Sequence, residues 1–150
     1  MLGSMAGTAK IGKHPIHPML VTFPIGLWMF SFICDLVHQS GGQDLWYAMA
    51  SYTMAGGIIG ALLAAIAGGI DLFNLKDRAI KRIGIVHMSL NLVITVLFII
   101  NLVWRSTAST QASGPVWLSL AAIILLLISG WLGGEMVYVH GAAVEPETRR

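Results

Sequence analysis

The stretch Met19–His38, MLVTFPIGLWMFSFICDLVH, decides the fold of this chain. It is almost entirely apolar, and its length of about 20 residues is what an α-helix needs to cross the hydrocarbon core of a bilayer. Inside lipid, backbone N–H and C=O groups must be satisfied within the segment, so we expect a helix. The stretch has no small-x-small cleavage site, which favours a retained transmembrane helix over a removed signal peptide.

Three further apolar runs follow, and each is also long enough to span a membrane. They lie at residues 46–70, 83–104 and 116–139. Only 11% of the residues are charged and the mean hydropathy is +0.77, whereas soluble domains carry about 25% charged residues. The connections are short, which makes successive helices antiparallel. The predicted fold class is all-α: a polytopic membrane protein built as an antiparallel bundle of four transmembrane helices.

The length suits one domain with short tails. We expect an N-terminal tail at 1–12, the four-helix transmembrane domain at 13–144 and a C-terminal tail at 145–150. Both Met1 and Met5 remain open as the native start. The single cysteine, Cys34, is expected to be a small buried residue, and zinc ribbons and covalent c-type haem are excluded. The net charge of +2, without a grouped basic face, does not indicate nucleic-acid binding.

The basic residues are distributed unevenly around the four expected spans. One set lies before the first, between the second and third, or after the fourth: Lys10, Lys13, Lys76, Arg78, Lys81, Arg82, Arg149 and Arg150. With four spans, all of these fall on one side of the membrane, and only Arg105 falls on the other. Cytoplasmic loops carry an excess of Lys and Arg, so we expect both termini in the cytoplasm.

Small residues recur four apart in the second and fourth runs. They are Gly56, Gly60, Ala64 and Gly68, and then Gly130 and Gly134. This spacing lets helix backbones approach closely in lipid, and we interpret these residues as packing positions only. The segments 68–71 (GGID) and 133–135 (GGE) both join a glycine pair to an acid, and the first and third runs each have a histidine near their start. This pattern weakly indicates two duplicated helical hairpins.

A polar cluster is predicted at the cytoplasmic face. Its candidate residues are His14, His17, His87 and His140, with Asn91, Asp71 and Glu135 around them. The histidines come from three different helices, and His87 and Asn91 are four apart and share a helix face. Ionisable groups within a span usually face the bundle interior. We therefore expect these side chains to form one site.

Imidazoles from facing helices can bind haem iron or a bare metal. In an up-down bundle the first and third helices lie diagonally opposite, so His17 (or His14) and His87 could hold a b-type haem between them, with His140 replacing one of them or bonding a propionate. Three histidines with one of the two acids would instead suit Zn, Fe, Cu or Ni.

A purely structural interpretation is also open for each of these groups. Histidines near the headgroups are often solvated or cap a helix end, and the acids could pair with Arg78 or Lys81. His38, close to Asp35 on the outer side, is expected to be a solvated or capping residue of this kind.

Two motifs resemble the signatures of a known family. They are HPIHPMLV followed by FPIGL at residues 14–27, and GGEMVYVHG at 133–141. These resemble the opening and closing of the bacterial membrane family called domain of unknown function 2231, and Arg82, His87 and Asn91 are similar to its third helix. The resemblance runs from about Lys13 to Val144. It implies a four-helix protein of the bacterial inner membrane, similar to membrane di-haem b-type cytochromes, some of whose relatives are joined to Rieske-type domains.

The resemblance carries over residue by residue to His14, His17, His87, Glu135 and His140. The chain departs from the di-haem pattern because only His38 lies on the outer side, so a second, outer haem is not expected. Our first hypothesis is therefore an inner-membrane protein that binds one haem b near its cytoplasmic face for electron transfer.

Two alternatives stand beside this hypothesis: a non-haem metal-binding membrane protein, and a cofactor-free structural or assembly subunit. The expected partners are the lipid bilayer with a redox protein, partner helices or a second copy of the chain. No nucleophile–base–acid set is visible, which favours an electron-transfer or binding protein over a stand-alone enzyme.

Overall fold

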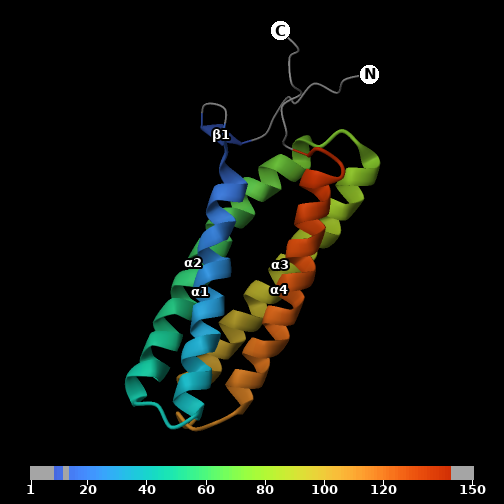
Figure 1. Cartoon of the computed structure of the whole chain (residues 1–150). Coiled ribbons are helices and arrows are strands. Elements are labelled where there is room, and N and C mark those ends of the chain that lie inside the picture. The colour runs from blue at the N-terminus through green and yellow to red at the C-terminus, as the bar shows by residue number, and fades with distance from the viewer. Residues whose placement is uncertain (1–8, 12–13, 143–150) are drawn as a thin grey trace.

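Four long helices make up nearly all of the described chain (Figure 1). The structure is a computed structural model, and it describes residues 9–11 and 14–142. The helices are α1 (Ile16–Gln39), α2 (Asp44–Asn74), α3 (Arg78–Arg105) and α4 (Gly114–Tyr138). Each is long and apolar enough to cross a membrane. The predicted all-α, four-helix architecture is confirmed.

Most helices extend beyond the apolar runs that predicted them. The charged segment 71–82, expected as a connection, is mostly helical, and only residues 75–77 join α2 to α3. Asp77 explains where α3 begins, because its carboxylate accepts hydrogen bonds from the backbone N–H groups of Ala79 and Ile80 at 2.7 and 3.1 Å. An acidic N-cap of this kind satisfies donors that the first helical turn leaves unpaired. The charged turns at helix ends are therefore helical although they lie outside the apolar runs.

The start of α1 is tied to the end of α2. Two short antiparallel strands, β1 (Lys10–Ile11) and β2 (His14–Pro15), precede α1. The backbone N–H of Ala9 donates to the Asp71 carboxylate at 2.7 Å, and the N–H of Ile16 donates to the Ala9 carbonyl at 2.9 Å. Asp71 therefore holds the residues that lead into the first helix.

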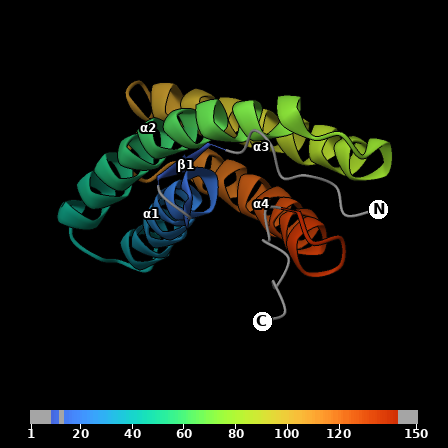
Figure 2. The same ribbon diagram turned by 90° about the horizontal axis from the view of Figure 1, so that it is seen from above.

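The helices form two hairpins, α1–α2 and α3–α4, which meet along α2 and α3. Seen from above, α1 lies against α2 and α4 lies against α3 (Figure 2). The diagonal helices α1 and α3 meet through core side chains, since the rings of Trp28 and Phe98 stack with centroids 4.3 Å apart. We call the end with β1, β2 and the α2–α3 connection the terminal end. The other end, with the α1–α2 and α3–α4 connections, is the loop end.

The outer surface of the bundle is apolar, and many polar side chains are buried inside it. Large apolar side chains are exposed on all four helices, for example Phe23, Ile66, Val96 and Leu127. The buried polar side chains are Ser31, Asp35, His38, Thr95, Asn101, Arg105, Ser119 and Ser129. A soluble protein shows the opposite distribution, whereas lipid demands apolar exteriors and inward-facing polar groups.

Glycines in α2 allow α1 to pack closely. A Cβ at Gly60 would lie 3.1 Å from Pro24 Cδ, and one at Gly57 would lie 2.5 Å from the Trp28 ring. The packing interpretation therefore holds for the α2 series. It does not hold for Gly130, because a Cβ there meets nothing within 4 Å in the described part of the chain.

Candidate functional site

Two of the predicted histidines meet at the terminal end, across the boundary between the hairpins. His17 comes from the first turn of α1 and His87 from the third turn of α3. Their ring centroids are 6.4 Å apart and their planes are at 89°. Both side chains are half-buried. The diagonal helices of the bundle therefore bring one imidazole each to a common place.

His17 is held by the end of α2. Its Nδ1 lies 2.9 Å from the Ala64 carbonyl oxygen. The ring rests on Gly68, where an added Cβ would lie 2.8 Å from His17 Cε1 and 2.9 Å from Nδ1. The ring therefore occupies the space that a side chain at this position of α2 would fill.

His87 is held in the same way by α4. Its Nδ1 lies 2.8 Å from the Ser129 carbonyl oxygen. The ring rests on Gly133, where an added Cβ would lie 3.2 Å from His87 Cε1. In both hairpins, the glycine follows the hydrogen-bonded carbonyl by four residues. The internal duplication that the sequence indicated thus has a matching geometry on its two sides.

The carbonyl contacts fix the tautomers of both rings. A carbonyl oxygen only accepts hydrogen bonds, so Nδ1 of each ring must carry the proton and donate. In the neutral imidazole the lone pair is then on Nε2. Among the described residues, Nε2 of His17 has no hydrogen-bond partner. The Nε2 of His87 lies 3.2 Å from the amide nitrogen of Asn91, which donates to it.

Asn91 sits at the centre of a small network around His87. Its amide nitrogen also donates to the His87 carbonyl and to the Ser129 hydroxyl, each at 2.8 Å. The amide has only two hydrogens for these three acceptors. It would therefore stay hydrogen-bonded if Nε2 of His87 took another partner.

Among the described residues, the other predicted site residues form no hydrogen bond or ring contact with this pair. His14 is exposed on β2, and His140 is exposed just after α4. Asp71 holds the Ala9 backbone, and Glu135 is half-buried in α4. Within residues 9–11 and 14–142, no three His, Cys, Asp or Glu side chains are grouped so that they could hold a metal ion. The structure assembles the pair His17 and His87, with Asn91 beside it.

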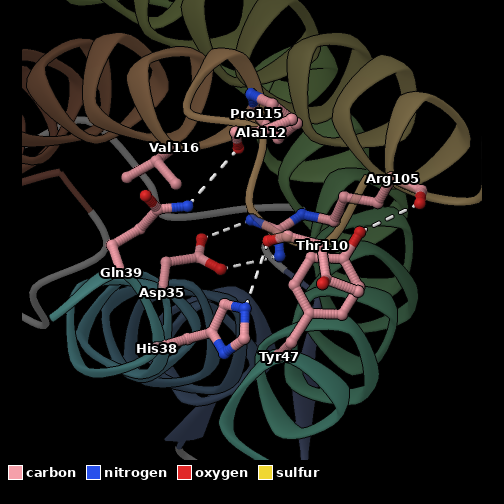
Figure 3. A pocket seen from close by; sticks show the side chains of 9 residues that line it. All are labelled: Asp35, His38, Gln39, Tyr47, Arg105, Thr110, Ala112, Pro115 and Val116. Atoms are coloured by element: carbon pink, nitrogen blue, oxygen red, sulfur yellow. Dashed lines mark hydrogen bonds and ion pairs between the residues drawn. The ribbon is translucent and has the colours of Figure 1, made fainter. Parts of the chain in front are cut away.

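A second polar cluster, not predicted from the sequence, lies at the loop end (Figure 3). Arg105 of α3 forms a two-pronged ion pair with Asp35 of α1, and each of the two side chains is only 2% exposed. The Nε of Arg105 donates to the Asn101 side chain at 3.0 Å. The Tyr47 hydroxyl donates to the Arg105 carbonyl at 2.9 Å, and the guanidinium lies over the Tyr47 ring.

The expectation that His38 is solvated or caps a helix end is wrong. His38 is 1% exposed, and its Nε2 lies 3.1 Å from the Thr110 carbonyl of the α3–α4 connection. Gln39 reaches the Ala112 carbonyl in the same connection. The loop-end cluster therefore joins α1 to the segment that follows α3. Its charged groups satisfy one another, which gives it a structural role.

A signal for this cluster was present in the sequence. Asp35 lies near the end of the first run and Arg105 near the end of the third, so antiparallel alternation puts both at the same end of the bundle. Charged residues within spans face inward and pair with one another. The charge of Arg105 at this end could thus have been assigned Asp35 as its partner.

Comparison with protein families assigns the chain to one family. Residues 13–146 match the model of a family described as predicted membrane protein (DUF2231). The match covers most of the chain, so the chain belongs to this family. Comparison with curated proteins and with solved structures gives no match.

Proposed function

We propose that this membrane protein binds one b-type haem between His17 and His87 and carries electrons. The observation that supports this proposal is the pair of imidazoles, 6.4 Å apart, each held through Nδ1 by a backbone carbonyl. Metal-binding histidines commonly donate their other ring N–H to a carbonyl or carboxylate, which fixes the ring and raises the basicity of the free nitrogen.

The separation of the rings suits a metal held between them. Metal–imidazole bonds are about 2 Å long, so two rings on opposite sides of one metal have centroids roughly 6 Å apart. His17 and His87 would together hold the iron of one haem, because two imidazoles are a common protein ligand set for b-type haem. A zinc site takes three or four protein ligands, and the described residues group no third one here. The pair therefore fits haem better than the non-haem alternative.

Bound haem would supply one-electron oxidation and reduction. The chain's own residues would hold and adjust it. His17 and His87 would ligate the iron through Nε2, and Asn91 would keep hydrogen bonds to the His87 carbonyl and Ser129 while giving up its contact with the ring. The apolar bundle would exclude water and thereby influence the reduction potential.

We place the terminal end in the cytoplasm of a bacterium, with the protein in its inner membrane. Lys76, Arg78 and Arg82 are exposed at that end. At the loop end, the charge of Arg105 is buried and neutralised by Asp35. The exposed positive charge of the described chain is thus confined to one end, as the positive-inside rule requires. A redox partner would then approach the haem from the cytoplasmic side.

The test is haem binding by the detergent-purified full chain, followed by optical spectra before and after reduction with dithionite. We expect the wild type to give a sharp reduced α-band with one iron per chain. His17→Ala and His87→Ala should lose the band or the haem. The matched controls, His14→Ala and His140→Ala, remove exposed imidazoles and should leave the spectrum unchanged.

Each other outcome selects a different function. A colourless protein with a bound transition metal would replace the haem proposal with the non-haem one. A protein that takes up neither haem nor metal would be a structural or assembly subunit, and its partner helices would be the next target. A wild-type spectrum that survives both His17→Ala and His87→Ala would reject this pair as the ligands.

A further inference from the structure

The geometry points to Gly68 and Gly133 as positioning residues: each uncovers a backbone carbonyl so that one imidazole can be held against a neighbouring helix. This inference rests on the proposed function in one respect: the identity of haem as the ligand that the two rings would bind. The orientation of the rings is a property of the chain itself and can be tested without haem. It goes beyond the packing role first given to Gly68.

The carbonyls of Ala64 and Ser129 each accept two hydrogen bonds. Each lies inside a helix, so it already accepts the helical hydrogen bond from the N–H group four residues later. A carbonyl oxygen has a second lone pair, which a side chain of another helix can use. His17 and His87 use this second lone pair, at 2.9 and 2.8 Å.

In a helix, that second lone pair is normally shielded. The Cα–Cβ bond tilts toward the helix N-terminus, so a side chain covers the turn before its own Cα. The residue that shields a carbonyl from the side is therefore about one turn later in the chain. At both carbonyls that residue is a glycine, Gly68 after Ala64 and Gly133 after Ser129. We call each of these two carbonyls, together with the glycine four residues later, a carbonyl–glycine motif, and the chain has one copy in α2 and one in α4.

The glycine and the histidine ring are in closer contact in one copy of the motif than in the other. A Cβ at Gly68 would lie within 2.9 Å of two His17 ring atoms, a distance that forces a shift. A Cβ at Gly133 would lie 3.2 Å from the nearest His87 atom, which calls for a smaller adjustment. His87 is also held by Asn91 and Ser129, whereas the described part of the chain offers His17 only the Ala64 carbonyl. Loss of Gly68 should therefore disturb its histidine more than loss of Gly133.

The two motifs also fix the angle between the rings. Each ring is held by a different helix, and the two planes end up at 89°. If both rings ligate one ferric haem, each imidazole π system interacts with a different iron d orbital, and the two orbitals stay close in energy. A strongly anisotropic low-spin electron paramagnetic resonance signal is then expected. A more parallel arrangement would give a less anisotropic signal.

The first test uses the haem-free full chain in detergent, with isotope-labelled histidine. Nitrogen NMR distinguishes the two imidazole tautomers, and His17→Ala and His87→Ala assign the two signals. We expect both rings to carry the proton on Nδ1. Gly68→Ala should abolish this signature for His17, and Gly133→Ala should weaken it for His87. Gly26→Ala and Gly130→Ala are the matched controls, because a Cβ at either position meets nothing within 4 Å.

A second variant pair protects the test against misfolding. The contact that Gly68→Ala creates is with the His17 ring, so adding His17→Ala should restore any thermal stability that Gly68→Ala loses. An additive loss in the double variant would assign Gly68 to general packing and overturn the inference. So would an unchanged Nδ1 signature of His17 in Gly68→Ala.

The third measurement loads haemin and separates the two proposals. We expect Gly68→Ala to bind haemin about 10- to 100-fold more weakly, the range for residues that orient metal ligands, and to lose the anisotropic signal. If the wild type binds no haemin, the proposed function fails, while the NMR result still decides the role of the glycines. If Gly68→Ala binds haemin with wild-type affinity and signal, the inference fails and the proposed function stands.

Discussion

Asp35 and Arg105 form a buried ion pair in a bundle that lipid surrounds. Burying two charges costs desolvation energy, which their mutual attraction offsets. If one of the two groups is removed, the other stays buried with its charge uncompensated. We predict that Asp35→Ala lowers the free energy of unfolding by about 3–5 kcal/mol. Arg105→Ala should cost a similar amount, because it leaves the Asp35 carboxylate unpaired and removes the donor to Oδ1 of Asn101. Unfolding of the detergent-solubilised protein by a denaturing detergent measures both.

The double variant distinguishes a buried pair from two separate contributions. Asp35→Leu with Arg105→Leu removes both charges and fills the space with apolar atoms, which is often nearly neutral for buried pairs. It should be more stable than Asp35→Ala or Arg105→Ala alone. Strictly additive losses would show that the two groups act independently, which their direct contact does not allow.

At the level of single residues, the sequence predicted which side chains are buried and at which end of the bundle they lie, because these properties depend on residue type and on position within an apolar run. Cys34 is buried, as expected, and His17 and His87 could be assigned to one face from their positions in two runs. The groups that hold these rings could not be predicted, because they are backbone carbonyls and every residue has one. What marks Ala64 and Ser129 is the glycine one turn later, and this signal is recognisable only once the facing helix is known.

Helix α3 offers a test at the level of one element. Its N-cap, Asp77, accepts hydrogen bonds from two backbone N–H groups of the first turn. We predict that Asp77→Ala lowers stability by about 1 kcal/mol, since the donors lose their partner. Asp77→Ser keeps an oxygen in place and should lose less. Thermal unfolding followed by circular dichroism measures both, and equal losses would assign the effect to the negative charge near the helix dipole and not to the cap.

The extent of the helices shows what hydrophobic patterning can and cannot predict. The apolar runs located all four helices, because crossing lipid requires an unbroken apolar segment. They placed most ends inside the true ones, because several turns that extend beyond the apolar runs carry charge, whereas the fourth run ended one residue beyond α4. Asp71 and Arg78 were assigned to a connection for this reason, although capping by Asp77 could have moved the start of α3 outward.

The whole molecule is polarised between its two ends. The terminal end exposes Lys76, Arg78 and Arg82, and it also holds the imidazole pair. At the loop end, Asp35 and Arg105 neutralise each other in a buried ion pair. The distribution of basic residues could be predicted from the sequence. The neutralisation of Arg105 could not, because it depends on how α1 and α3 are aligned.

This polarity predicts the orientation in the membrane. In a Cys34→Ala background, we would introduce Ser109→Cys at the loop end or Ala79→Cys at the terminal end, both at exposed positions. A membrane-impermeant maleimide added to intact spheroplasts should label the first variant and not the second, and lysis should make the second reactive. The reverse pattern would put the exposed positive charge and the imidazole pair outside. The partner of the pair would then be an extracytoplasmic protein, and the positive-inside argument would fail for this chain.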